Sequence, residues 1–117
     1  MPLVRLETSE RLAPQDKARL CADLSRACSE IIGKPELYVM VAIHDQVSML
    51  HAGKSGPAAF VDVRSIGGLG PDVNRALSAR LCEAVGAGAH VPSERIYLNF
   101  TEVGASAWGH DGETFGG

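Results

Sequence analysis

Two segments of the chain repeat apolar residues at helical spacing. The first begins at Pro14, and its apolar positions are Leu20, Leu24, Ala27, Cys28, Ile31 and Ile32. Such spacing places them on one face of a helix, and Gly33 is typical of a helix C-terminus. The second begins at Pro71, with the stripe Val73, Leu77, Leu81, Ala84 and Val85. There we expect Gly86 and Gly88 to end the helix.

Other segments have the patterns of strands. Residues 3–7 and 60–64 alternate apolar and polar positions, which is typical of strands with one buried face. Residues 37–44 are almost entirely apolar, so we expect a central strand that is covered on both faces. Residues 95–101 place Ile96, Leu98 and Phe100 on one face and Tyr97, Asn99 and Thr101 on the other. A further short strand is expected at residues 47–51.

The order of these elements repeats along the chain. Ala18-Arg19-Leu20-Cys21 in the first helix recurs as Ala79-Arg80-Leu81-Cys82 in the second, and each helix lies between predicted strands. We therefore predict two consecutive βαβ units, each with a right-handed crossover. Together they form an α+β fold in which a four-stranded mixed sheet carries both helices on one face.

The opposite face of that sheet is expected to be apolar. We place Tyr38, Met40, Tyr97 and Asn99 on it. An apolar face of this size is not left to water in a monomer. Closed cyclic assembly of several copies is the simplest way to cover it.

The last segment, residues 105–117, is rich in glycine. It nevertheless contains Trp108 and Phe115, and aromatic residues in a terminal segment suggest docking rather than disorder. We therefore expect the tail to be part of the folded structure.

Length and composition narrow the class of protein. A chain of 117 residues is typical of one domain. Its net charge of −3 and its scattered basic residues exclude the footprint of a nucleic-acid binder. Neither a membrane span nor a secretory signal is visible, so we expect a cytoplasmic protein without a membrane partner. Cys21, Cys28 and Cys82 agree with a reducing compartment, and small apolar core residues are favoured over a metal or redox role.

The N-terminus offers the clearest candidate chemistry. Pro2 is compatible with removal of Met1, which would leave a free secondary amine. The pKa of a free α-amino group is ordinarily about 8, and both burial and a nearby cation lower it. A neutral amine near pH 7 can act as a general base. Many ordinary proteins also begin Met-Pro, so this dipeptide alone is weak evidence.

Further short motifs are spread along the whole chain. They are Met1-Pro2-Leu3, Gly33-Lys34-Pro35-x-x-Tyr38, Ser65-Ile66-Gly67, Arg95-Ile96-Tyr97-Leu98-Asn99, Trp108-Gly109 and Gly112-x-Thr114-Phe115. In this order and spacing they resemble the macrophage migration inhibitory factor family of the tautomerase superfamily. The resemblance implies a single MIF-like tautomerase domain over residues 1–117. It also implies a homotrimeric barrel with active sites between subunits.

The same resemblance implies keto–enol tautomerisation of phenylpyruvate-like 2-oxo acids and of dopachrome-type substrates, with no cofactor and no metal. Pro2 would be the catalytic base. The substrate-binding residues would be Leu3, Lys34, Tyr38, Ile66, Tyr97, Asn99, Trp108 and Phe115. Of these, Lys34 and the backbone N–H of Ile66 would bind the carboxylate, and Tyr97 and Asn99 would come from the adjacent subunit. The others would form apolar walls around an aromatic ring.

The chain departs from the family pattern at three places. The CxxC of animal members is Pro57-Ala58-Ala59-Phe60, so no redox role is expected. His110 replaces the second tryptophan of the family's tail, which changes one wall of the expected pocket and would admit a more polar substrate. Gly68 replaces a lysine of the animal members.

Two other functions stay open at this point. One is a MIF-like cytokine, or a signalling or binding protein, that keeps a vestigial pocket, engages a protein receptor and leaves cells by a non-classical route. The other is a dehalogenase or decarboxylase reaction, which ranks last because no matched arginine–carboxylate set accompanies Pro2. Without the resemblance, Lys34 would be explained by the helix dipole and Ile66 by core packing.

Overall fold

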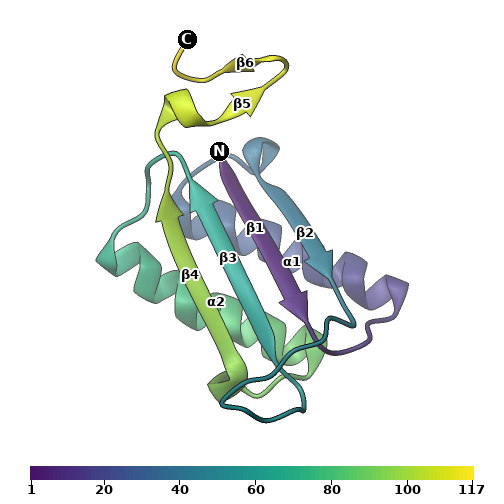
Figure 1. The fold of residues 1–117 in the computed structure, drawn as a ribbon. Coiled ribbons are helices and arrows are strands. Elements are labelled where there is room, and N and C mark those ends of the chain that lie inside the picture. Colours follow the sequence, from purple (N-terminus) through teal and green to yellow (C-terminus); the bar gives the residue numbers. More distant parts are fainter.

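The computed structural model describes residues 1–117 and contains both βαβ units (Figure 1). The first comprises β1 (Pro2–Thr8), α1 (Pro14–Ile32) and β2 (Met40–His44), and the second β3 (Ala59–Ser65), α2 (Pro71–Ala89) and β4 (Ile96–Glu102). Strands are parallel within each unit, whereas β1 and β3 are antiparallel, which gives the order β2-β1-β3-β4. Both helices cover the same face of the sheet, so the predicted fold class is confirmed. Neither helix has the length and apolar character needed to cross a membrane.

The core lies between the sheet and the two helices. Its largest fully buried side chains come from alternate positions of β1 and β3 and from the predicted helix stripes: Val4, Leu6, Val61, Val63, Leu24, Leu77, Leu81 and Val85. Burial of one such side chain contributes about 1.5–3 kcal/mol. The repeated apolar pattern of the sequence therefore supplies most of what holds the sheet and helices together.

The second helix does not end at its glycines, so that prediction was wrong. It continues to Ala89, and His90 adopts the left-handed conformation with φ 58°. Gly88 instead faces the first helix, where a Cβ would lie 2.9 Å from Leu20 Cδ1. The glycine thus permits close approach of the two helices. By contrast, α1 ends as predicted, with Gly33 left-handed and its N–H donating to the Ser29 carbonyl.

Two strand predictions were also wrong. Leu37 and Tyr38 lie in the short 3₁₀ helix η1 (Glu36–Tyr38), and the strand that follows begins only at Met40. It is an edge strand rather than a central one, and Met40 is 66% exposed. Residues 47–51 form no strand; His51 makes only an isolated bridge with Lys54. A short apolar run does not by itself distinguish a central strand from an edge strand or a short helical turn.

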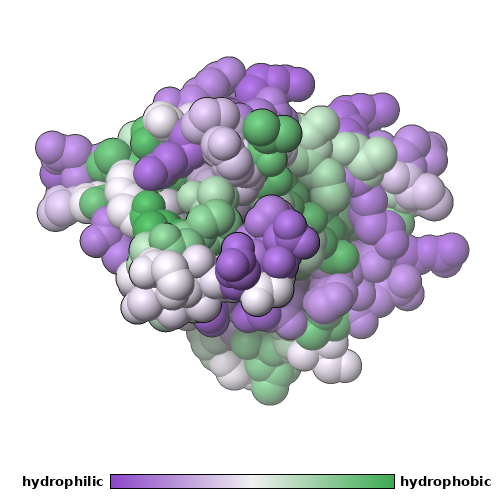
Figure 2. Space-filling model, turned by 90° about the horizontal axis from the view of Figure 1, so that it is seen from above, coloured by the Kyte–Doolittle hydropathy of each residue, from purple (hydrophilic) through white to green (hydrophobic).

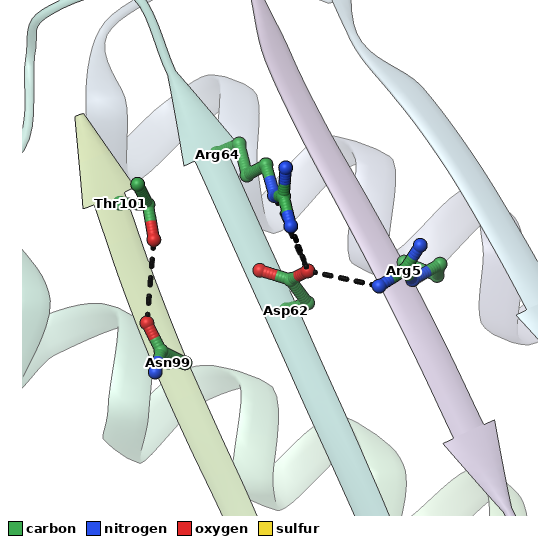
Figure 3. Close-up of polar contacts among 5 residues, drawn as sticks. All are labelled: Arg5, Asp62, Arg64, Asn99 and Thr101. Carbon is green, nitrogen blue, oxygen red and sulfur yellow. Dashed lines mark hydrogen bonds and ion pairs between the residues drawn. The ribbon is translucent and has the colours of Figure 1, made fainter. Parts of the chain in front are cut away.

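The sheet face opposite the helices is more polar than we expected (Figure 3). Because Val4, Leu6, Val61 and Val63 face the helices, the alternate positions face away. They include Arg5, Glu7, Asp62, Arg64, Tyr97, Asn99 and Thr101. Asp62 accepts from Arg5 at 3.1 Å and from Arg64 at 3.3 Å. The expected apolar face was therefore wrong: its centre is an ion-pair cluster, and Tyr38 is not on it.

The tail leaves the sheet at the end where the chain begins (Figure 1). It contains the 3₁₀ helix η3 (Ala105–Ala107) and a small hairpin of β5 (Gly109–His110) and β6 (Glu113–Thr114). The Phe115 N–H donates to the Trp108 carbonyl at 3.1 Å. The tail is thus part of the folded structure, as its aromatic residues predicted.

Candidate functional site

One end of the sheet brings together the N-terminus, the start of β2, the end of β3 and the tail. Strand register pairs Pro2 with Ser65 and Leu3 with Met40. A cavity of about 460 Å³ lies at this end, lined by Met1, Pro2, Leu37, Tyr38, Val39, Met40, Trp108, Gly109, His110 and Phe115. Figure 2 looks onto this end and shows apolar groups next to the polar residues of the tail. The cavity is therefore a mainly apolar space beside the first two residues.

Four of the predicted site residues line this cavity: Pro2, Tyr38, Trp108 and Phe115. Pro2 is fully buried, whereas Tyr38 is 47% exposed. The sequence interpretation did not assign Leu37, Val39 and Met40 to the site. The apolar run at residues 37–44 could have indicated these cavity residues, but we interpreted it as a central strand covered on both faces.

Leu3, Lys34 and Ile66 do not line the cavity, but they lie around the N-terminus. Leu3 pairs with Met40 in the sheet. The charge of Lys34 acts on the Met1 amino group. A Cβ on Gly68 would lie 3.4 Å from Lys34 Cε, so the turn that contains Ile66 passes beside this lysine. Of these three residues, Lys34 therefore has a direct electrostatic effect on the amine, and Leu3 and Ile66 lie at the same end of the sheet.

The amino group of Met1 has a pKa below its ordinary value. Burial is the larger cause, and the positive charge of Lys34 is the smaller one. Both effects disfavour the protonated amine. The N-terminus thus lies where an amine loses its proton more readily than it does in water.

Two left-handed glycines form the turn after β3. The Ser65 hydroxyl donates to the Gly67 carbonyl at 2.7 Å, and both Gly67 and Gly68 are left-handed, with φ 72° and 81°. A Cβ on Gly68 would lie 2.7 Å from Ile32 Cγ2. A side chain there would therefore strain the backbone and collide with the end of α1, which accounts for the glycine at this position.

Tyr97 and Asn99 lie far from Pro2 within one chain. Pro2 pairs with Ser65, and Ser65 pairs with Glu102, so Pro2 and Glu102 are level in the sheet. Tyr97 precedes Glu102 by five residues, which at about 3.3 Å per residue is about 17 Å along the strand. Tyr97 is 65% exposed. A site that contains both Pro2 and Tyr97 therefore needs a second copy of the chain.

Asn99 has a partner on its own strand. The Thr101 hydroxyl donates to Asn99 Oδ1 at 3.3 Å, on the face that also carries the Asp62 cluster (Figure 3). This contact occupies the carbonyl oxygen of the amide. The NH₂ group of Asn99 stays available as a donor.

His110 also lines the cavity. Its ring stacks on Phe115, with centroids 5.8 Å apart and planes 16° from parallel. The tail wall therefore combines an apolar ring with an imidazole that can donate or accept a hydrogen bond.

The cysteines lie outside the cavity. Burial raises the pKa of Cys28 to about 12 and also raises the pKa values of Cys21 and Cys82. All three thiols are therefore protonated near pH 7, in agreement with the packing role predicted for them. No group of three or more His, Cys, Asp or Glu side chains is arranged to hold a metal ion.

Comparison with known proteins decides the family. The family model described as macrophage migration inhibitory factor (MIF) matches residues 1–116. The chain belongs to the macrophage migration inhibitory factor family. The resemblance found in the sequence motifs is thus confirmed.

Relatives in this family match most of the chain. A homolog of macrophage migration inhibitory factor from Trichuris trichiura is 36% identical over 91 residues, which cover 78% of this chain and 80% of that protein. The macrophage migration inhibitory factor of Rattus norvegicus is 30% identical over 115 residues, 98% of this chain and 99% of that protein. A crystal structure of the homologue from Prochlorococcus marinus has a TM-score of 0.92 and 33% identity, and covers 97% of this chain and 98% of that chain.

Proposed function

We propose that this protein is a keto–enol tautomerase of phenylpyruvate-like 2-oxo acids and dopachrome-type substrates, with Pro2 as its general base once Met1 is removed. The observation that carries the proposal is the lowered pKa of the Met1 amino group beside an apolar cavity. Pro2 is one residue further along the chain and fully buried. We expect burial and the charge of Lys34 to act on its amine in the same direction.

The reaction needs one proton to move between carbon and oxygen. The neutral amine of Pro2 would take a proton from C3 of the 2-oxo acid, leaving an enolate, and the protonated amine would return it to the enolate oxygen. Positioned acid–base catalysis of this kind contributes about 10²–10⁴-fold. Because the reaction only moves a proton within the substrate and changes no oxidation state, this mechanism uses no redox cofactor.

The surrounding residues would bind and orient the substrate. Lys34 and the backbone N–H of Ile66 would hold the carboxylate close to the amine. The apolar walls would be Leu3, Tyr38, Trp108 and Phe115. These walls would hold the aromatic ring and keep water away from the amine, which favours its neutral form.

We further propose that the active unit is a homotrimer whose sites lie between subunits. Tyr97 and Asn99 of one copy would complete the cavity of the next, because they lie about 17 Å and 10 Å along the sheet from the level of Pro2 in their own chain. Two open sheet edges, β2 and β4, support assembly through strand contacts. The exposed side chains of Met40 and Tyr97 would be covered in this way.

The test is a spectrophotometric assay of phenylpyruvate tautomerisation on protein whose N-terminus has been checked by intact mass. Pro2→Ala should lower kcat/KM by about 10²–10⁴-fold, with the same oligomer mass by light scattering. Pro14→Ala, at the first turn of α1 and outside the cavity, is the matched control and should retain activity. Wild-type activity in Pro2→Ala would show that the amine is not the base.

A second proposed role is that of a ligand for a protein receptor. The rat relative is named as a macrophage migration inhibitory factor, and this name favours the role. The two roles differ in their dependence on the cavity. Receptor binding by Pro2→Ala protein at wild-type affinity would support a role that is independent of catalysis.

A further inference from the structure

Tyr97 is in contact with a histidine from a distant part of the chain. The rings of His51 and Tyr97 meet edge to face, with centroids 4.7 Å apart and planes at 70°. His51 Nε2 is buried and has no hydrogen-bond partner, so the ring is placed by packing rather than by a bond from that atom. The contact therefore restrains an otherwise exposed tyrosine.

His51 is itself held by Arg95, two residues before Tyr97. The Arg95 guanidinium donates to four backbone carbonyls of one loop: His51 at 3.3 Å, Lys54 at 3.0 Å, Gly56 at 3.4 Å and Pro57 at 2.6 Å. His51 and Lys54 also exchange two backbone hydrogen bonds of 3.0 Å. Five donors in a rigid fork suit arginine to this task.

We propose that His51, held by Arg95, is a positioning residue that sets the ring of Tyr97 for the cavity of a neighbouring subunit. This inference rests on the proposed function, because only there does Tyr97 contact a substrate. The loop of residues 51–57 belongs to the same chain as Tyr97. The orientation of the Tyr97 ring is therefore set within each subunit, before the subunits assemble. Pre-orientation lowers the entropy that substrate binding must remove.

The first test is a double-mutant cycle on the processed protein. His51→Ala should raise the KM for phenylpyruvate about two- to tenfold with kcat little changed, as expected for loss of an edge-to-face pair. His51→Phe keeps a ring and should restore KM. In a Tyr97→Ala background, His51→Ala should have no further effect, because the residue on which it acts is absent.

Ser55→Ala is the matched control, because Ser55 is exposed in the same loop, and it should leave KM unchanged. An unchanged KM in His51→Ala would overturn the proposal. So would an effect that persists in full in the Tyr97→Ala background, because that would indicate a general structural role.

The second test needs no activity and separates this inference from the proposed function. NMR of protein with ¹³C-labelled tyrosine should show ring resonances of Tyr97 that move on His51→Ala and return towards their wild-type positions in His51→Phe. Resonances of Tyr97 that do not respond to His51→Ala would overturn the inference. An inactive wild-type protein would instead contradict the proposed function.

Discussion

Lys34 acts on the Met1 amino group through its charge, although the two belong to different elements. Met1 precedes β1, and Lys34 follows the C-terminus of α1. Burial of the amine lowers its pKa most, and the lysine adds to the effect. The end of the first helix therefore contributes to the chemistry of the N-terminus.

The first prediction concerns the pH dependence of this amine. In the processed protein, kcat/KM should fall as the pH decreases through the pKa of the Pro2 amine, because only the neutral form takes a proton. Lys34→Ala removes a cation that disfavours protonation, so this acidic limb should move to higher pH. The pH profile of kcat/KM measures the shift. Lys54→Ala, an exposed lysine in the 51–57 loop, should leave the limb in place.

The loss of the lysine should also raise KM if it binds the carboxylate. These two effects are separable, because the limb of kcat/KM reports the free enzyme and KM reports affinity. A profile of Lys34→Ala that superposes on that of the wild type would contradict the electrostatic role.

The second prediction concerns the turn after β3. Gly68→Ala should destabilise the protein by about 1–3 kcal/mol, because a left-handed non-glycine residue is strained and its Cβ would lie 2.7 Å from Ile32 Cγ2. Gly53→Ala is the matched control: Gly53 is also left-handed, with φ 72°, but its Cβ would have no neighbour within 4 Å. Urea denaturation compares the two.

The difference between these two variants isolates the collision with α1. Equal destabilisation would show that the backbone conformation alone accounts for the effect. Because the same turn carries Ile66, Gly68→Ala should also raise the KM for the 2-oxo acid more than Gly53→Ala does.

The third prediction concerns the loop between β1 and α1. Asp45 accepts from the Leu12 N–H at 2.9 Å and from Lys17 Nζ at 3.2 Å. The Leu12 N–H is the main cause of a lowered pKa at Asp45, and Lys17 adds to it. Asp45→Asn should therefore reduce the free energy of unfolding at pH 7.

The sign of the pH effect follows from the direction of that shift. A carboxyl whose pKa is lower in the folded state stabilises the protein fully above its unfolded pKa of about 3.9. The contribution is lost as the pH falls through the lower folded pKa. The difference between wild type and Asp45→Asn should thus shrink below about pH 4, as followed by urea denaturation at several pH values. Asp111→Asn, at an exposed hairpin turn, is the matched control.

Much of the fold could be predicted because local periodicity reports burial. The stripe from Leu20 to Ile32 and the alternation at residues 60–64 follow directly from which side chains face the core. The apolar run at residues 37–44 was misinterpreted, because it shows only that apolar contacts are needed. In the structure Leu37 and Met40 line a cavity and are exposed in the single chain.

By itself, then, the sequence determined the two βαβ units, the family and the residues that carry its motifs, since these depend on local pattern and order. Only the tertiary structure decided which of those residues meet. Strand register places Pro2 beside Ser65, which pairs with Glu102. Tyr97 lies five residues before Glu102 on the same strand and is therefore far from Pro2. The fold also brings His51 against Tyr97 and Lys34 near the N-terminus. Such contacts join residues far apart in the chain, and no local periodicity encodes the path of the backbone between them.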